Sequence, residues 1–329
     1  MFIRYARANN PFALILIFLL GALLWVPGFS NPEPPAPTVY APLYAGLDIF
    51  LRAHPWFSVI AAFLVVITAA LFLNFLIHEH HILVKKSWMP ALIFMVLSAC
   101  APELLWLHPP LIAGLFLLGA LHLLLGTYRA DKAYAPVFNA GLLIGIGGLF
   151  YVPVLVYIGF SLTVFILLRP FIWREWVIFS IGALLPWLYA GVWYFWHNRL
   201  DEVTSEMVLN PIAGRDFFLK ISPAYYGLMF MLAFLLAVAI SRFTAGAGSS
   251  TLKTKKAVSV MVWFFIFGLA AVIPAQSYHV TGFTFVLIPV AVFISKYFIV
   301  SRRLWLAESF FLLLLLSIGL SYAINRNLF

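Results

Sequence analysis

Charged residues are scarce in this sequence. Only 9% of its 329 residues are Asp, Glu, Lys or Arg, whereas 64% are hydrophobic and 18% aromatic. Soluble domains average about 25% charged residues. The shortage excludes a soluble globular fold and indicates an all-α integral membrane protein. It also argues against nucleic acid as a partner, because the net charge of +9 comes from basic residues in short loops between apolar runs.

Cysteine is nearly absent, since Cys100 is the single one, and an intramolecular disulfide is excluded. What the chain has instead is long apolar runs, of which roughly 20 residues are needed to cross a bilayer. They predict eleven spans, near residues 12–29, 57–77, 88–106, 110–126, 136–150, 153–168, 177–196, 223–241, 257–273, 282–299 and 305–323. The first run has no small-residue cleavage pattern after it, which favours a retained anchor over a signal peptide.

The stretch 136–168 can form one long helix or two short ones. Pro153 follows several glycines and removes a backbone donor, which favours a break at Tyr151-Val152-Pro153. With the break, fifteen of the 20 lysines and arginines fall on the side of the N-terminus and five on the other side. Basic loops stay in the cytoplasm, so the N-terminus is predicted inside and the C-terminus outside.

Two segments on the predicted outer side are long enough to form structure. Residues 30–56 begin with prolines and continue with Leu43, Leu47, Phe50 and Leu51 at helical spacing, which predicts a helix lying on the membrane surface. Residues 198–222 hold most of the remaining outer charge. No separate soluble domain is predicted, so residues 1–329 form a single polytopic domain.

Two acids on the outer side are candidate catalytic residues. Asp48 lies in the predicted surface helix, and Glu103 lies in the turn between the third and fourth spans. Such a pair can hold a divalent cation, or act as base and partner in a transfer reaction on a lipid-borne phosphate. The predicted substrate-binding residues at the same level are Arg52, Arg215, Lys220 and His279. The alternative is that each is a solvated loop residue, because spacing alone does not bring the two acids together.

The run His78-Glu79-His80-His81 raises the question of a metal site at the inner end of the second span. Only His78 and His81 have the spacing of one helix face, so the run fits ordinary interface anchors better than a ligand set. The span centres are nearly free of ionisable groups. Ion-coupled transporters keep carboxylates or histidines at that depth, so a transporter is disfavoured.

The passage from "LNFLIHEHHILVKKSWMPALIFMVLSACAPELLWLHPP" to "GALLPWLYAGVWYFW" resembles a family of Bacteroidota inner-membrane proteins of unassigned function, over about two-thirds of the chain. The same region is similar in layout to GT-C membrane glycosyltransferases, which move sugars from polyprenyl-phosphate donors. That resemblance implies one acid in the first outer loop and an acidic motif in the second. Asp48 and Glu103 occupy these loops, although the second loop holds a single acid instead of a pair.

The leading hypothesis is therefore a membrane protein that handles a polyprenyl-phosphate-linked saccharide at its outer face, with glycosyl transfer as its activity. Asp48 would act as base or cation ligand, and Glu103 as its partner. The rival hypothesis is a non-catalytic membrane subunit or scaffold of an envelope complex, which binds a membrane-protein partner through aromatic helix faces or residues 198–222. The lone acid at Glu103 favours the rival.

Overall fold

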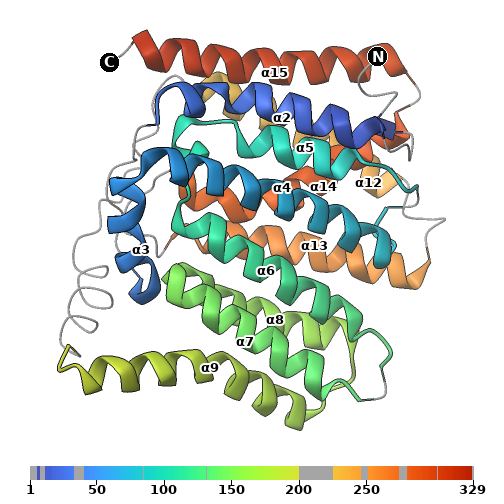
Figure 1. The fold of residues 1–329 in the computed structure, drawn as a ribbon. Helices are drawn as coiled ribbons and strands as arrows, with labels where there is room; N and C mark the ends of the chain where they lie inside the picture. The colour runs from blue at the N-terminus through green and yellow to red at the C-terminus, as the bar shows by residue number, and fades with distance from the viewer. Residues whose placement is uncertain are drawn as a thin grey trace.

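The computed structural model of the protein is a bundle of α-helices (Figure 1). It describes residues 6–7, 12–32, 41–83, 85–130, 132–199, 225–245, 251–273, 280–301 and 303–327. No strand occurs in those ranges. The all-α prediction is confirmed for this part of the chain.

Six helical stretches of the described chain are long and apolar enough to cross a membrane. They are α2 (Phe12–Ser30), α4 (Pro55–Glu79), α6 (Pro109–Gly126), α9 (Trp173–Trp196), η6 with α14 (Val280–Phe283 and Thr284–Val300), and α15 (Leu304–Asn327). A 25-residue helix such as α4 is roughly 37 Å long and exceeds the hydrocarbon thickness of a bilayer. The chain is therefore a multi-pass membrane protein.

Five further helices complete the bundle and are shorter or more polar. They are α5 (Met89–Ser98), α7 (Tyr134–Phe150), α8 (Val156–Leu168), α12 (Tyr226–Ala245) and α13 (Leu252–Ala270). Each predicted apolar segment overlaps one helix of the bundle. The predicted third span, residues 88–106, is helical only to Ser98, because a turn and the short 3-10 helix η1 (Pro102–Leu105) follow. Irregular backbone is tolerated there because protein surrounds it.

The predicted break between residues 136 and 168 is confirmed. Helix α7 ends at Phe150, the 3-10 helix η2 (Val152–Leu155) contains the proline, and α8 begins at Val156. After α8, the Arg169 guanidinium donates to the Thr127 carbonyl, which precedes α7, at 3.0 Å. The end of α8 therefore lies beside the start of α7, and the two helices run in opposite directions (Figure 1).

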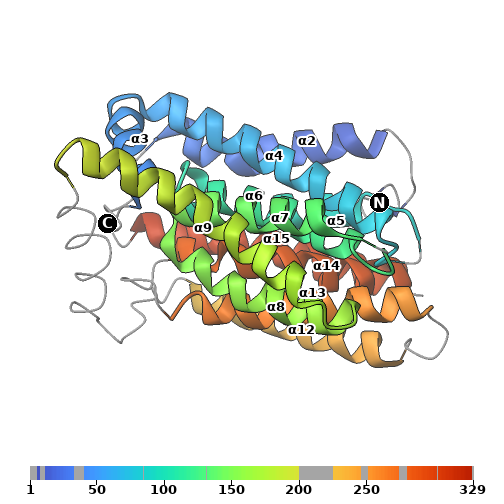
Figure 2. The same cartoon turned by 90° about the horizontal axis from the view of Figure 1, so that it is seen from below.

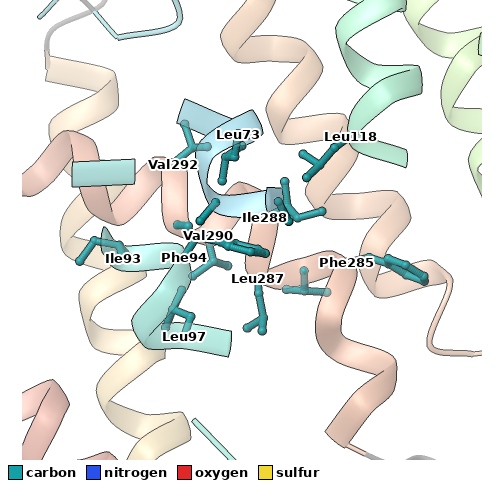
Figure 3. Close-up of a cluster of buried hydrophobic side chains, with 14 of the residues drawn as sticks. Leu73, Ile93, Phe94, Leu97, Leu118, Phe285, Leu287, Ile288, Val290 and Val292 are labelled. Carbon is teal, nitrogen blue, oxygen red and sulfur yellow. The ribbon is translucent and has the colours of Figure 1, made fainter. Parts of the chain in front are cut away.

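The core lies around α5 and α14. All ten residues of α5 are buried, as are Leu287, Ile288 and most other residues of α14. Figure 3 shows these side chains meeting Leu73 of α4 and Leu118 of α6. A helix that is apolar on all sides belongs in such a centre. Helix α9, by contrast, lies at the edge and has few buried residues.

Helix α9 is attached to the bundle through a close crossing with α7. At Gly141 a methyl group would overlap the Phe179 carbonyl oxygen, and at Gly182 it would overlap the Phe138 carbonyl oxygen. Gly145 approaches the carbonyl oxygen of Ala183 in the same way. Small residues spaced four apart allow membrane helices to bring their backbones together.

Helix α3 (Pro42–Ala53) crosses one end of the bundle (Figures 1 and 2). Its inner face buries Tyr44, Asp48 and Leu51, and the Tyr44 hydroxyl donates to the Leu107 carbonyl at 2.7 Å. The sequence correctly predicts a helix here. Its buried stripe is nevertheless more polar than expected, because Leu43 and Phe50 are about half exposed and Asp48 is buried.

The two ends of the bundle differ in charge. We call the end that carries α3 the α3 end and the opposite end the basic end, at the left and right of Figure 1. Contacts that join the loops of the basic end include those from Arg169 to Thr127 and from Thr254 to His81. The cations of its loops and helix ends include Arg7, Lys85, Lys86, Arg129, Lys132, Arg169, Arg174, Lys253, Lys255, Lys256 and Arg303, whereas those of the α3 end include Arg52 and Arg199.

Candidate functional site

Asp48 is held on the buried face of α3. Its carboxylate accepts a hydrogen bond from the Nε atom of Arg52 at 2.6 Å, one helical turn further along. Asp48 is 4% exposed, while the Arg52 side chain is 31% exposed. The ion pair offsets the cost of burying the carboxylate. Two of the predicted site residues, Asp48 and Arg52, are therefore brought together.

Glu103 lies on η1 and meets the start of α12. Its Oε2 atom accepts a hydrogen bond from the Tyr225 hydroxyl at 2.9 Å. Burial and the nearby carboxylate raise the pKa of Tyr225 well above its ordinary value, so the phenol stays protonated and remains the donor. Cys100 is buried beside this contact, and burial raises the pKa of its thiol to about 12, which leaves it unreactive.

The two candidate acids thus have different partners on different elements: Asp48 pairs with Arg52 and Glu103 with Tyr225. Neither acid lines the groove described next. The remaining predicted site residues, Arg215, Lys220 and His279, lie outside the described residues. The same holds for most of the predicted outer segment 198–222.

A groove of about 740 Å³ lies at the α3 end, between α3, α7 and α9. Its walls are largely apolar, with polar groups contributed by Tyr189, Tyr194 and Arg199 near the end of α9. The apolar lining residues are Pro42, Leu43, Ala45, Gly46, Ile49, Leu142, Ile146, Leu149, Leu185, Pro186, Ala190 and Trp193. An apolar cleft with a few polar groups at one end is suited to a ligand with a hydrocarbon chain and a polar head.

Two contacts of α9 frame the groove. The glycine crossing fixes its middle on α7, and the Tyr194 hydroxyl reaches the Pro42 carbonyl of α3 at 3.2 Å. Pro186 lies between these points and lines the groove. Proline removes the amide that would bond the Gly182 carbonyl and so weakens the helix there. Figure 2 shows the end of α9 beside α3.

The histidine run at the basic end is divided among different partners. The His78 ring nitrogen Nε2 lies 3.1 Å from both the amide nitrogen and the carbonyl oxygen of Ser87. His80 instead bonds His122 of α6, with 3.1 Å between ring nitrogens, and His81 has a positive φ of 53°. In the part of the chain that the structure describes, no three His, Cys, Asp or Glu residues gather as metal ligands.

A buried ion pair joins three helix ends at the basic end. The Arg169 guanidinium lies 3.0 Å from the Glu175 carboxylate at the start of α9, and it also donates to Thr127 after α6. Both charged side chains are less than 5% exposed. Buried charges require such pairing, and the contact fixes the starting point of α9.

Sequence reasoning missed Tyr225 and the groove. Tyr225 lies 122 residues from Glu103, and no periodicity links the two. The aromatic run Trp193–Trp196 was the available signal for the groove, because it places amphipathic rings at a membrane interface near the outer acids.

Comparisons with known proteins do not identify a relative of this chain. No protein-family model matches the chain, and no curated protein or solved structure matches it either. The resemblances to the Bacteroidota family and to the GT-C layout therefore stay predictions. What the structure shows is the architecture: the chain is a multi-pass membrane protein, and its described residues form helices without strands.

Proposed function

We propose that this protein binds a polyprenyl-phosphate-linked saccharide at the outer face of a bacterial inner membrane and acts there in glycosyl transfer. The groove between α3, α7 and α9 carries the proposal, because its apolar walls suit an isoprenoid chain. Arg199 at the end of α9 supplies a cation for the phosphate. In this proposal all eleven helices of the bundle cross the membrane, as in the GT-C layout.

The charge of the two ends supports the orientation. Most of the described cations lie at the basic end, including Lys253, Lys255 and Lys256 at the start of α13. Cytoplasmic loops are enriched in Lys and Arg. The basic end is accordingly the inner one, and α3, the groove and both candidate acids face outward.

The transfer step would use Asp48 and Glu103 without a metal ion. Asp48 would accept the proton of the attacking hydroxyl as the bond between sugar and phosphate breaks, and polyprenyl phosphate would leave. Glu103 would orient the acceptor. Each carboxylate has a protein partner, Arg52 for Asp48 and Tyr225 for Glu103, and the proposed step needs no metal ion.

Native mass spectrometry of the protein released gently from its own membrane tests the lipid site. Gly46 lines the groove and has open space around its α-carbon, so Gly46→Phe fills the groove without a clash. Gly191 of α9 has equally open space but is not a lining residue, which makes Gly191→Phe the matched control. The proposal expects a polyprenyl-phosphate mass on the wild type and on Gly191→Phe, and its loss from Gly46→Phe. A wild-type protein without such a lipid contradicts it.

The second candidate function is a non-catalytic subunit, and the contacts of the two acids favour it. Asp48 pairs with Arg52 within α3, and Glu103 accepts from Tyr225 at the start of α12, so each acid already has a structural partner. Asp48→Asn with Glu103→Gln decides between the functions. Unchanged glycan assembly by this folded variant, with a copurifying protein that is lost on deleting residues 200–216, supports the subunit. Loss of assembly with the lipid retained supports the transferase.

A further inference from the structure

A cluster of cations gathers around one tyrosine ring at the basic end, far along the bundle from the groove. The Arg129 guanidinium lies 5.4 Å from the centre of the Tyr128 ring, and the Lys256 ammonium lies 5.5 Å from the same centre. Lys253 lies one turn before Lys256 on α13 and therefore on the same face. Three cations from two segments, the end of α6 and the start of α13, thus share one small region.

This arrangement is electrostatically unfavourable as it stands. Within the described ranges, no carboxylate forms an ion pair with Arg129, Lys253 or Lys256. Lys253 and Lys256 also occupy the first turns of α13, where the helix dipole repels positive charge. Burial first, then His122 and then Lys253 lower the pKa of His80, at the end of α4, to about 4.

The backbone holds the cluster in place. Arg129 has a φ of 58°, in the left-handed region that residues other than glycine rarely adopt. The first turn of α13 is fastened to the loop after α4, because the Thr254 hydroxyl donates to the His81 carbonyl at 3.2 Å. Cations at such fixed positions form a built site for an anion, whereas interface lysines on loose loops only contribute to a general field.

The neighbouring apolar surface shows which kind of anion fits. Leu252 precedes Lys253 and is 66% exposed. Phe75 of α4 is 51% exposed and packs against the ring of His122, which bonds His80. The cations therefore lie where helix ends meet apolar, bilayer-facing side chains. That is the level of phospholipid phosphates.

We propose that Arg129, Lys253 and Lys256 bind the phosphate of an anionic phospholipid headgroup at the basic end. The lipid chains lie along the exposed apolar surface beside Leu252 and Phe75. The site is separate from the groove at the α3 end and does not depend on the function proposed for it.

Binding of dioleoyl phosphatidylglycerol to the delipidated full-length protein in detergent tests this site, with native mass spectrometry as the readout. Dioleoyl phosphatidylcholine and inorganic phosphate are the comparison probes. The test variants are Lys253→Gln/Lys256→Gln and Arg129→Gln. The matched control is Arg174→Gln/Arg303→Gln, which removes two exposed charges from the same end on α9 and before α15.

Each lost charge weakens binding about fivefold, since a basic residue near an anionic surface contributes about 1 kcal/mol. The double test variant is expected to bind phosphatidylglycerol about 25-fold more weakly, Arg129→Gln about fivefold, and the control within about twofold of the wild type. Equal losses in both double variants, or equal binding of phosphatidylcholine, would overturn the site. Displacement of the lipid by millimolar inorganic phosphate would overturn the assignment of the ligand as a lipid.

Discussion

The two ends of the bundle are held together in different ways. At the basic end, the buried pair of Arg169 and Glu175 joins α6, α8 and α9 through charged contacts. At the α3 end, helix α3 is fastened by neutral hydrogen bonds, from Tyr44 to Leu107 and from Tyr194 to Pro42. Neutral hydrogen bonds contribute about 1 kcal/mol each, and removing one partner of a buried ion pair costs several times that amount.

This difference in contacts indicates which end of the molecule can open locally. A helix such as α3, fastened by a few neutral hydrogen bonds, can open locally at a lower free energy than the whole chain unfolds. Ligand sites need such freedom, and the groove lies at this end. The basic end serves as the fixed base from which α9 extends. Changes at the basic end should therefore affect stability most, and changes at the α3 end should affect ligand retention most.

The largest expected effect is at the basic end. Glu175→Gln leaves the Arg169 charge buried without its counter-ion, which lowers the free energy of unfolding by about 4 kcal/mol. Arg174→Gln next to it removes an exposed charge and changes stability by less than about 0.5 kcal/mol. Unfolding in mixed micelles measures both. Equal effects of the two variants would show that the buried pair does not fix this end.

The next effect is at the crossing between α7 and α9. Gly145→Leu forces the side chain against the Ala183 carbonyl and the Pro186 ring, and it should cost about 3 kcal/mol and displace α9. Gly191→Leu on α9 meets open space and should cost almost nothing. Thermal melting in detergent compares them, and lipid retention should fall in the first variant alone. A tolerated Gly145→Leu contradicts the close crossing.

A third effect depends on pH and concerns the α3 end. Burial lowers the pKa of His108 from an ordinary 6.5 to about 3, so the neutral ring caps α6 by accepting from the Leu111 amide. The unfolded chain binds a proton below pH 6.5 and the folded chain does not, so this stability is lost as pH falls from about 6.5 toward 3. At pH 5 the loss is about 2 kcal/mol.

The variant His108→Asn removes the pH dependence due to residue 108 and keeps the helix cap, because asparagine caps a helix without titrating. Melting temperature followed from pH 7 to pH 5 should fall less in the variant than in the wild type. Parallel pH profiles would show that His108 does not contribute to the acid sensitivity.

The smallest expected effect is the loss of the tie between α9 and α3. Tyr194→Phe removes the hydroxyl that reaches the Pro42 carbonyl and should lower stability by about 1 kcal/mol. Faster exchange of lipid from the groove should accompany it, as measured by the decay of the lipid-bound mass after dilution. Tyr189→Phe, at the groove but without this contact, is the comparison. Equal exchange rates in both variants would show that the hydrogen bond from Tyr194 to Pro42 does not slow lipid exchange.

Much of the fold was predictable because the bilayer restricts it. Apolar runs locate every helix of the described bundle, and Pro153 locates the break between α7 and α8. The pairing of Asp48 with Arg52 was also within reach, since residues four apart share a helix face. All of these features follow from the spacing of residues that are close together in the sequence.

The rest depends on contacts between distant segments. The bond from Tyr225 to Glu103 and the groove both result from how α12 and α9 pack, which hydrophobic periodicity does not record. Several glycines were noted before Pro153, but the role of Gly141, Gly145 and Gly182 as a contact surface requires knowing that α7 and α9 are neighbours. The sequence therefore predicted the helices better than the site.

Photo-crosslinking from the groove tests the central claim most directly. Ile49 lines the groove, whereas Ile166 of α8 lies outside it, and the two side chains are similarly exposed at 74% and 69%. Benzoylphenylalanine replaces each of them in turn. Irradiation in native membranes, followed by mass spectrometry of the adducts, should give a polyprenyl-phosphate lipid at position 49 and bulk phospholipid at position 166. Bulk phospholipid at both positions would contradict a specific lipid site between α3, α7 and α9.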